Sequence, residues 1–222
     1  MPAPEIKICG LGTPEAIDAA VDAGATHIGL VHHEASPRHL SLADAARLRA
    51  RVPERTKVVL LLVNQQPQPT MEAIAAIRPD IVQFHGKETP EWLALVRQHM
   101  RIGVWKAFGL RDAAALERSR KYHDAADLIL YDAPANTLPG GNGLVLDWSL
   151  LAGFRPFMPW GLAGGLNAGN VADAVARTGA PLVDVSSGVE SAPGVKDDAL
   201  IRAFVRAAKG AGAPSYPAES GR

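Results

Sequence analysis

The chain has 222 residues, its 23 basic and 23 acidic side chains cancel, and 47% of its residues are hydrophobic. This composition is typical of one ordinary globular domain and excludes a general electrostatic footprint for nucleic acid or an acidic membrane. A single cysteine excludes an intrachain disulfide. Because there is neither a signal-peptide pattern nor an apolar run of membrane-spanning length, we expect a cytoplasmic protein with no nucleic-acid or membrane partner.

Short apolar runs typical of strands alternate with alanine-rich segments that carry apolar residues at helical spacing. The expected strands begin near Glu5, His27, Lys57, Asp80, Ile102, Asp127, Phe157 and Pro181. The expected helices cover Pro14–Ala23, Leu42–Arg51, Thr70–Ile77, Pro90–His99, Asp112–Lys121, Trp148–Ala152, Ala168–Arg177 and Asp197–Ala207.

Successive expected strands start about 22 to 30 residues apart. Eight such strand–helix pairs favour a single-domain (β/α)8 TIM barrel over an open doubly wound sheet, which more often has about five or six strands. We expect the barrel to span residues 1–208 and the Gly-, Ala-, Pro- and Ser-rich segment 209–222 to be a flexible tail. Active sites of such barrels lie at the strand C-termini, so reactive side chains should follow the apolar runs.

The only cysteine, Cys9, closes the first apolar run. Thr13 as N-cap and Pro14 at the first helical position predict that a helix begins just beyond it. Cys9 should therefore lie at the carboxyl end of a strand, on the same face as Lys7. A lone cysteine is more often a small buried hydrophobe than a reactive group, so both interpretations remain open at this point.

Two aspartates end apolar runs farther along the chain. Asp132 follows the apolar run Leu128–Tyr131, which supplies few polar groups near its carboxyl group. Such surroundings favour the neutral carboxyl that a general acid needs, although Asp132 could equally be a helix cap or an ion-pair partner. Asp184 could hold a ligand hydroxyl or orient a loop.

Glycine-rich loops follow the expected sixth, seventh and eighth strands. Glycine allows backbone N–H groups to approach an anion, and a helix start near Asn167 adds partial positive charge. These loops predict a phosphate site after strands seven and eight, with tight turns as the alternative. The candidate phosphate ligands are Gly143, Gly164, Gly165, Ser186, Ser187 and Gly188.

Three further side chains are candidates for substrate contacts. Arg38 follows Ser36 and Pro37 in a loop, and its forked guanidinium suits a carboxylate, although most loop arginines are simply solvated. Gln83 and His85 lie two residues apart, so both should point to one side of the fourth strand and could face a ligand.

Metal binding is not expected. The neighbouring His32 and His33 point to opposite sides of an extended segment, so they cannot easily share an ion. No cysteine partner or H-E-x-x-H helix accompanies them.

Taken together, these motifs resemble the phosphoribosylanthranilate isomerase family of tryptophan biosynthesis. The matching motifs in chain order are K-I-C-G-L at 7–11, S-P-R at 36–38, V-Q-F-H-G at 82–86, D-A at 132–133, G-G-N-G at 140–143, L-A-G-G-L-N at 162–167, V-D-V-S-S-G-V-E at 183–190 and P-G-x-K-D at 193–197. The segment His32–Glu34 departs from the family, which usually has aromatic or apolar residues there, and this bears on the shape of the anthranilate pocket.

The resemblance implies an Amadori rearrangement of N-(5-phosphoribosyl)anthranilate, a phosphorylated small molecule, to 1-(2-carboxyphenylamino)-1-deoxy-D-ribulose 5-phosphate. It implies that Asp132 protonates the ribose ring oxygen, that the Cys9 thiolate removes the C2 proton and that Arg38 pairs with the anthranilate carboxylate. It also implies that the glycine-rich loops hold the phosphate and that no cofactor or metal takes part. A monomer and a homodimer are both compatible with it.

Two alternatives come from different functional classes. The histidine-pathway isomerase performs the same rearrangement on another aminoaldose but uses carboxylates as both acid and base, so Cys9 argues against it. The second alternative is a phosphate-ligand-binding barrel that has lost catalysis. The presence of both Cys9 and Asp132 argues against that reading.

Overall fold

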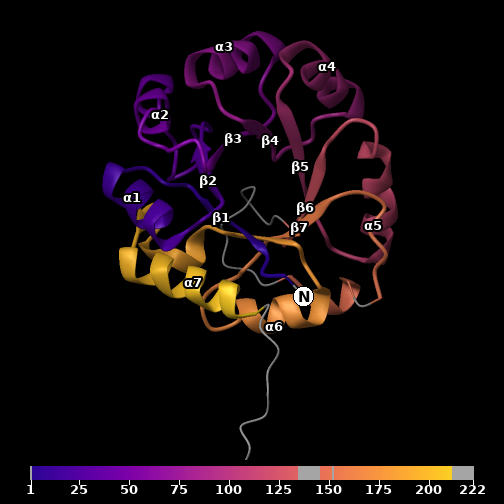
Figure 1. The fold of residues 1–222 in the computed structure, drawn as a ribbon. Helices are drawn as coiled ribbons and strands as arrows, with labels where there is room; N and C mark the ends of the chain where they lie inside the picture. The colour runs from indigo at the N-terminus through magenta and orange to yellow at the C-terminus, as the bar shows by residue number, and fades with distance from the viewer. Residues whose placement is uncertain (1, 135–145, 152, 212–222) are drawn as a thin grey trace, which may run out of the picture.

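The computed structural model describes residues 2–134, 146–151 and 153–211. Its strands form a closed parallel barrel in chain order, in which the eighth strand pairs with the first (Figure 1). The barrel strands are β1 (Glu5–Cys9), β2 (His27–Val31), β3 (Lys57–Leu62), β4 (Ile81–Phe84), β5 (Gly103–Gly109), β6 (Leu128–Asp132), β7 (Trp160–Leu162) and β8 (Leu182–Val185). The predicted (β/α)8 barrel is confirmed.

Helices surround the strands on the outside of the barrel. The α-helices are α1 (Pro14–Ala23), α2 (Leu42–Arg49), α3 (Pro67–Ile77), α4 (Pro90–Met100), α5 (Ala113–Ser119), α6 (Val171–Thr178) and α7 (Asp198–Gly210). The short elements are the 3-10 turns η1 (Arg120–Tyr122), η2 (Trp148–Leu151) and η3 (Ser187–Val189) and a hairpin of β9 (Glu190–Ala192) and β10 (Val195–Lys196). Within the described residues, no helix has the length and apolar character needed to cross a membrane.

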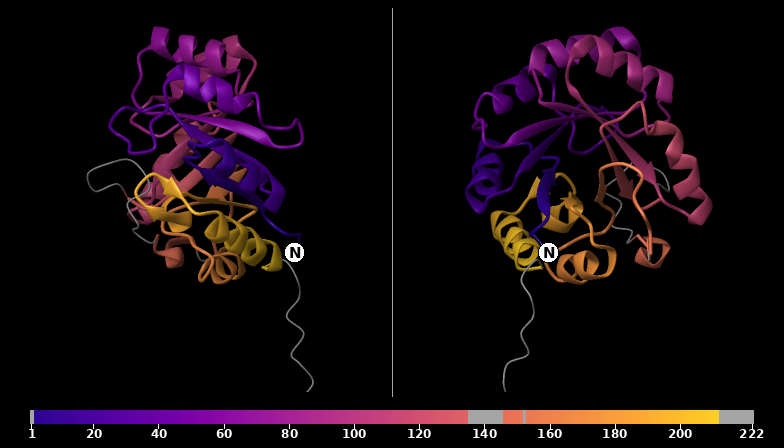
Figure 2. Two further views of the ribbon diagram at one scale, coloured as in Figure 1. Left: turned by 90° about the vertical axis from the view of Figure 1, so that its left-hand side faces the viewer. Right: turned by 45° about the vertical axis from the view of Figure 1, so that its right-hand side comes forward.

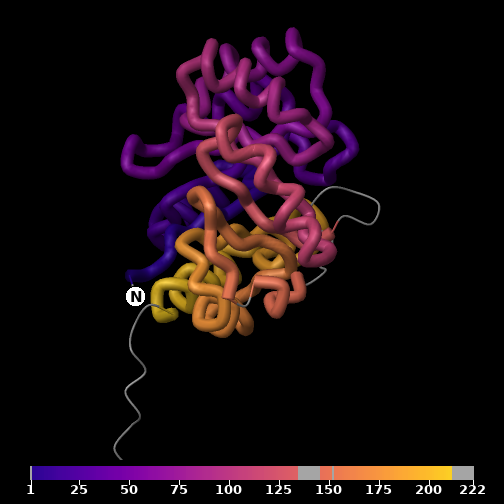
Figure 3. Tube along the Cα trace, turned by 90° about the vertical axis from the view of Figure 1, so that its right-hand side faces the viewer, coloured from indigo at the N-terminus to yellow at the C-terminus, as the bar shows by residue number. Residues whose placement is uncertain are grey.

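The last helix packs beside the first elements of the chain. Helix α7 lies next to α1 and close to β1, as the side views in Figures 2 and 3 show. The ring of helices therefore closes at the same place as the ring of strands, where β8 meets β1.

The start of α1 has the predicted capping. The Thr13 side chain accepts a hydrogen bond from the Ala16 N–H at 3.2 Å, and Pro14 is the first helical residue. Gly24 ends the helix with φ 92°, a left-handed conformation that costs glycine little. Because β1 ends at Cys9 and α1 begins at Pro14, the β1–α1 loop and the cysteine before it lie at the C-terminal rim of the barrel.

The helix expected from Thr70 begins at Pro67, and two other predicted helices differ from those observed for local reasons. The segment expected to be helical from Trp148 forms only the 3-10 turn η2, and Gly153, two residues after Leu151, takes φ 70°. Helix α6 begins at Val171, later than expected, because side-chain bonds organise the preceding residues as a turn. The Asn170 side chain accepts from the Asn167 N–H at 2.8 Å, and the Asn167 side chain accepts from the Gly169 N–H at 2.8 Å.

The hydrophobic core has an outer and an inner layer. The outer layer joins the outward side chains of the strands to the helices, with Ile6, Ile8 and Phe84 among its fully buried members. The inner layer fills the barrel with residues such as Trp105 and Leu130. Strand alternation separates the two layers, because successive residues point to opposite faces.

A small apolar cluster lies at the rim of the barrel interior. It consists of Cys9, Val31, Leu61 and Val63, which come from the ends of β1, β2 and β3 and from the residue after β3. This cluster, with Cys9 in it, borders the C-terminal end of the barrel interior.

A buried ion pair fastens the loops after β3 and β4. The Glu88 carboxylate accepts the backbone N–H groups of Asn64 and Gly86 at 2.7 and 2.8 Å, and it lies 3.2 Å from Lys106 Nζ. The Lys106 ammonium also donates to the carbonyls of Phe84, Gly86 and Ala107. Both side chains are almost fully buried, so each charge depends on the other.

We expect Glu88→Ala to lower the free energy of unfolding by about 3 to 5 kcal/mol, because it leaves the Lys106 ammonium buried without a counter-charge. Urea denaturation measures the change. The matched control is Glu117→Ala, which removes a solvent-exposed carboxylate paired with Arg120 and should leave stability almost unchanged. Equal losses in both variants would contradict the structural role of the buried pair.

Candidate active site

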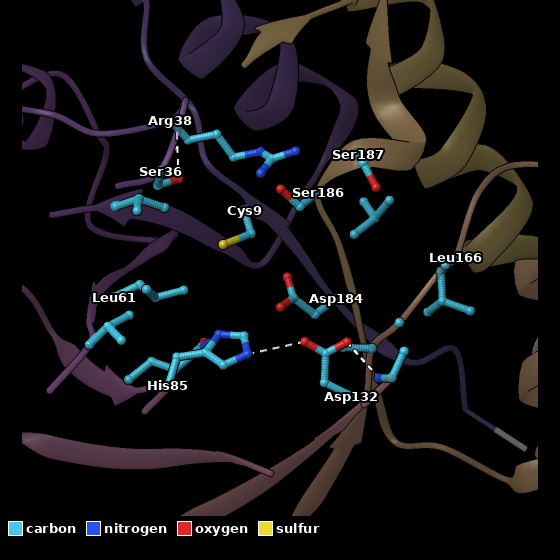
Figure 4. Close-up of a pocket in the computed structure, with 18 of the residues that line it drawn as sticks. Cys9, Ser36, Arg38, Leu61, His85, Asp132, Leu166, Asp184, Ser186 and Ser187 are labelled. Atoms are coloured by element: carbon cyan, nitrogen blue, oxygen red, sulfur yellow. Dashed lines mark hydrogen bonds and ion pairs between the residues drawn. The ribbon is translucent and has the colours of Figure 1, made fainter. Parts of the chain in front are cut away.

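A single cavity at the C-terminal ends of the strands gathers most of the predicted site residues (Figure 4). Its walls come from the ends of β1, β4, β6 and β8 and from the loops after β2, β6, β7 and β8. The predicted residues that line it are Cys9, Arg38, Gln83, His85, Asp132, Gly164, Gly165, Asp184, Ser186 and Ser187. We call this space the mouth cavity.

Cys9 ends β1 and faces the mouth cavity. Its register partner on β2 is Gly29, and a Cβ atom at that position would lie only 2.9 Å from the Cys9 sulfur. Gly29 therefore leaves the space that the thiol occupies. The side chain is buried at 4% relative exposure but borders the cavity, so a bound ligand could touch it.

A buried ion pair lies beside the thiol. Lys7 and Asp184 share one register position on β1 and β8, and Lys7 Nζ lies 2.9 Å from Asp184 Oδ2. The other oxygen, Asp184 Oδ1, is buried without a partner among the described residues. The sequence placed Lys7 on the same strand face as Cys9 but indicated no role for it. The pattern that could have pointed to Lys7 is a lysine two residues before a cysteine at the end of a strand.

The groups around Cys9 shift the pKa of its thiol in opposite directions. Burial raises the pKa of the Cys9 thiol and the Asp184 carboxylate adds to that shift, whereas the ammonium groups of Lys7 and Lys196 oppose it. Burial alone would lower the pKa of Lys7, but Asp184 and Cys9 raise it above its ordinary value. Lys7 is therefore a permanent cation next to the thiol at neutral pH.

Asp132 and His85 face each other across the mouth cavity from the ends of β6 and β4 (Figure 4). Asp132 Oδ2 lies 3.1 Å from His85 Nε2, and Asp132 Oδ1 accepts the Ala133 N–H at 2.7 Å. On the other side of the ring, His85 Nδ1 lies 3.4 Å from Gln83 Nε2. The two residues of the V-Q-F-H-G motif thus point to the same side, as their spacing predicts, and His85 orients Asp132.

Arg38 borders the mouth cavity, and two of its guanidinium nitrogens already have a hydrogen-bond partner. Its Nε and Nη2 each donate to the Glu190 carboxylate at 2.7 Å, and the side chain is largely buried. It is therefore not a solvated surface arginine. Lys196 Nζ lies 2.7 Å from the same carboxylate. Glu190 and Lys196 lie in the family motifs at 183–190 and 193–197, but the sequence alone indicated no role for either.

The loops after β7 and β8 meet at one wall of the mouth cavity. Gly164 and Gly165 take φ 85° and 68°, and together with Ser186 and Ser187 they line the cavity. Within the described residues, no acceptor takes the backbone N–H of Gly165 or Ser187. Such unpaired N–H groups suit an anion.

One predicted phosphate ligand stands apart from that wall. Gly188 does not line the mouth cavity but packs against the Leu166 carbonyl, where a side chain would collide. Gly143 lies outside the described residues.

The histidines after β2 have separate surroundings. His32 Nδ1 lies 2.8 Å from the Leu40 carbonyl oxygen, whereas His33 borders the mouth cavity. Within residues 2–134, 146–151 and 153–211, no group of three or more His, Cys, Asp and Glu side chains could hold a metal ion.

The closed barrel and the mouth cavity place the chain in the class of (β/α)8-barrel enzymes, with a thiol, a carboxyl group and an anion-suited wall around one space. Residues 6–207 match the sequence model of the family described as N-(5'-phosphoribosyl)anthranilate (PRA) isomerase. The chain belongs to this family, and it is an isomerase of tryptophan biosynthesis.

Individual relatives agree with the family match. The N-(5'-phosphoribosyl)anthranilate isomerase of Erythrobacter litoralis is 62% identical over 206 residues, which cover 93% of this chain and 99% of the relative. A crystal structure of monomers generated from the dimeric enzyme of Thermotoga maritima superimposes with a TM-score of 0.83 at 34% identity, covering 93% of this chain and 99% of that one. A relative crystallised with reduced 1-(o-carboxyphenylamino)-1-deoxyribulose 5-phosphate has a TM-score of 0.81 at 33% identity, with the same coverage.

We expect the rate of Cys9 alkylation by iodoacetamide to rise with pH through a midpoint above the usual range of a cysteine thiol, because burial raises its pKa. Mass spectrometry follows the reaction without ambiguity, since Cys9 is the only cysteine. The unfolded chain in urea is the control and should titrate as an ordinary thiol. A folded-state midpoint below that of the unfolded chain would mean that the neighbouring ammonium groups outweigh burial.

Proposed function

We propose that the chain converts N-(5'-phosphoribosyl)anthranilate into 1-(2-carboxyphenylamino)-1-deoxy-D-ribulose 5-phosphate with Asp132 as general acid and Cys9 as general base. The observation that carries this proposal is that both side chains border one cavity from strands that are not neighbours. An Amadori rearrangement needs one group to give a proton at the sugar ring oxygen and another to take one from C2.

Asp132 is suited to the first step. The N–H of Ala133 holds one of its oxygens, and His85 faces the other. A proton given by Asp132 to the ribose ring oxygen lets the C1–O bond break while the anilino nitrogen supplies its electron pair, so that a protonated Schiff base forms. The fixed carboxyl needs no reorganisation at that moment.

Cys9 is suited to the second step. Its thiolate takes the proton from C2, and the electrons of the C–H bond neutralise the Schiff base to give the enolamine. The Lys7 and Lys196 ammonium groups stabilise the thiolate and offset part of the effect of burial, which still leaves the pKa of Cys9 raised. Proton return to C1 and loss of the hydroxyl proton from the C2 oxygen then give the ketone, and no cofactor or metal takes part in these steps.

The ends of the substrate have separate sites in this proposal. Arg38 holds the anthranilate carboxylate. The phosphate binds at the loops after β7 and β8, and the polar groups at the floor of the mouth cavity hold the sugar hydroxyls. The assigned phosphate ligands are Gly143, Gly164, Gly165, Ser186, Ser187 and Gly188, and the assigned sugar contacts are Gln83, His85 and Asp184.

The remaining expectations stay predictions. They are a cytoplasmic protein, a monomer or homodimer, a catalytic barrel over residues 1–208 and a flexible tail over 209–222. Helix α7 continues to Gly210, so the tail could begin only after it.

Cys9→Ala and Asp132→Asn should each lower kcat by about 100-fold or more, because each removes one of the two proton-transfer groups. The fluorescence decrease of phosphoribosylanthranilate measures turnover, and affinity for the reduced product shows that the cavity is intact. Asp124→Asn, which alters an exposed carboxylate outside the cavity, is the control and should keep wild-type turnover. Wild-type turnover of Cys9→Ala would refute the assignment of the base.

Arg38→Ala should raise KM by about one to two orders of magnitude, because a substrate carboxylate loses its charged hydrogen-bond partner. The effect on kcat should be smaller, since the guanidinium takes no part in proton transfer. Steady-state kinetics separates the two constants. An unchanged affinity for the carboxylated ligand would exclude Arg38 from the carboxylate site.

A further inference from the structure

Arg38, Glu190 and Lys196 form one buried charged cluster beside the mouth cavity. Glu190 opens the β9–β10 hairpin and Lys196 ends it, whereas Arg38 comes from the loop after β2. The side chains of the three residues are only 9%, 4% and 2% exposed, respectively. The hairpin and the β2 loop also touch directly, because Gly194 packs against the Pro37 carbonyl.

The carboxylate fixes the direction of the guanidinium. Glu190 occupies Nε and Nη2 of Arg38 with two bonds of 2.7 Å, a geometry that allows only one orientation of the planar group. Within the described residues, Arg38 Nη1 has no acceptor. The Arg38 stem lies against Gly10, where any side chain would displace it.

The charges of the cluster do not cancel. Arg38 and Glu190 alone would form a neutral pair, whose attraction for a second carboxylate is weak. The Lys196 ammonium lies 2.7 Å from Glu190 Oε1 and restores one net positive charge to the cluster. Because the cluster is largely buried, bulk water and salt screen that charge less than they would at a surface.

We propose that Glu190 and Lys196 are positioning residues that make Arg38 selective for a ligand carboxylate: Glu190 orients the guanidinium, and Lys196 offsets the charge of Glu190. This inference rests on the proposed role of Arg38 as the carboxylate site. It goes beyond that role by assigning the selectivity to two residues that do not themselves line the mouth cavity.

The protonation states agree with this arrangement. Burial alone would raise the pKa of Glu190, but its bonds to Arg38 and Lys196 hold that pKa below its usual range. Burial lowers the pKa of Lys196, and the Glu190 carboxylate opposes that shift. Lys196 also donates to the Ser186 carbonyl at 2.9 Å, so a test must separate carboxylate recognition from support of the phosphate loop.

The experiment compares two ligands by calorimetry. One is reduced 1-(o-carboxyphenylamino)-1-deoxyribulose 5-phosphate, and the other is the same compound with phenyl in place of carboxyphenyl. The variants are Lys196→Met and Lys196→Gln, which remove the charge, Lys196→Arg, which keeps it, and the double variant Lys196→Met with Glu190→Gln, which removes both charges. Urea denaturation checks that each variant is folded, and Lys196→Gln gives the same information should Lys196→Met not fold.

We expect Lys196→Met and Lys196→Gln to weaken binding of the carboxylated ligand about tenfold and to change binding of the phenyl ligand by less than about twofold. Lys196→Arg should bind both ligands nearly as the wild type does. The double variant should recover only to within about threefold of wild-type affinity for the carboxylated ligand, because Arg38 regains its net charge but is oriented less firmly by the amide.

Two outcomes would overturn the inference. Equal weakening of both ligands would mean that Lys196 supports the phosphate loop or the fold, and a double variant no better than Lys196→Met would mean that charge balance is irrelevant. If Arg38 did not bind the carboxylate at all, the result would differ from both of these outcomes. The wild type would then bind both ligands equally, and Arg38→Ala would change neither affinity.

Discussion

The mouth of the barrel depends on the buried ion pair between Lys7 and Asp184. The two residues occupy one register position on β1 and β8, the strands at which the barrel closes, and their charged atoms are 2.9 Å apart. Neither charge could remain in the interior alone, because an unpaired buried ion costs several kcal/mol. The pair therefore fixes this seam of the barrel and also puts a cation beside Cys9.

Buried charges on this side of the barrel occur in sets that join distant segments. Glu88 and Lys106 link the loops after β3 and β4 to β5, and Glu190 joins the last hairpin to Arg38 in the loop after β2. Each set holds loops that have little regular structure of their own. Mouth geometry in this barrel is thus maintained by polar contacts, whereas the barrel itself is maintained by its two apolar layers.

Strand positions were predictable to within a few residues, because apolar runs and alanine-rich segments alternate clearly along the chain. The segment from Trp148 forms only the 3-10 turn η2, and α6 starts later than predicted because asparagine side chains bond to nearby backbone there. Placement of Cys9 and Asp132 at strand ends followed from pattern alone. Arg38 was placed in the correct loop, but its bond to Glu190 joins residues far apart in the sequence and left no periodic signal.

The sequence by itself determined the order of the elements, the barrel class and the family, because periodicity, caps and motifs are properties of neighbouring residues. Only the tertiary structure decided which charges meet. Lys7 contacts Asp184 and Arg38 contacts Glu190 because barrel closure brings the end of the chain against its beginning. Those contacts oppose or add to the effect of burial on the Cys9 pKa and fix the direction of the Arg38 guanidinium, and both depend on distances that no local pattern encodes.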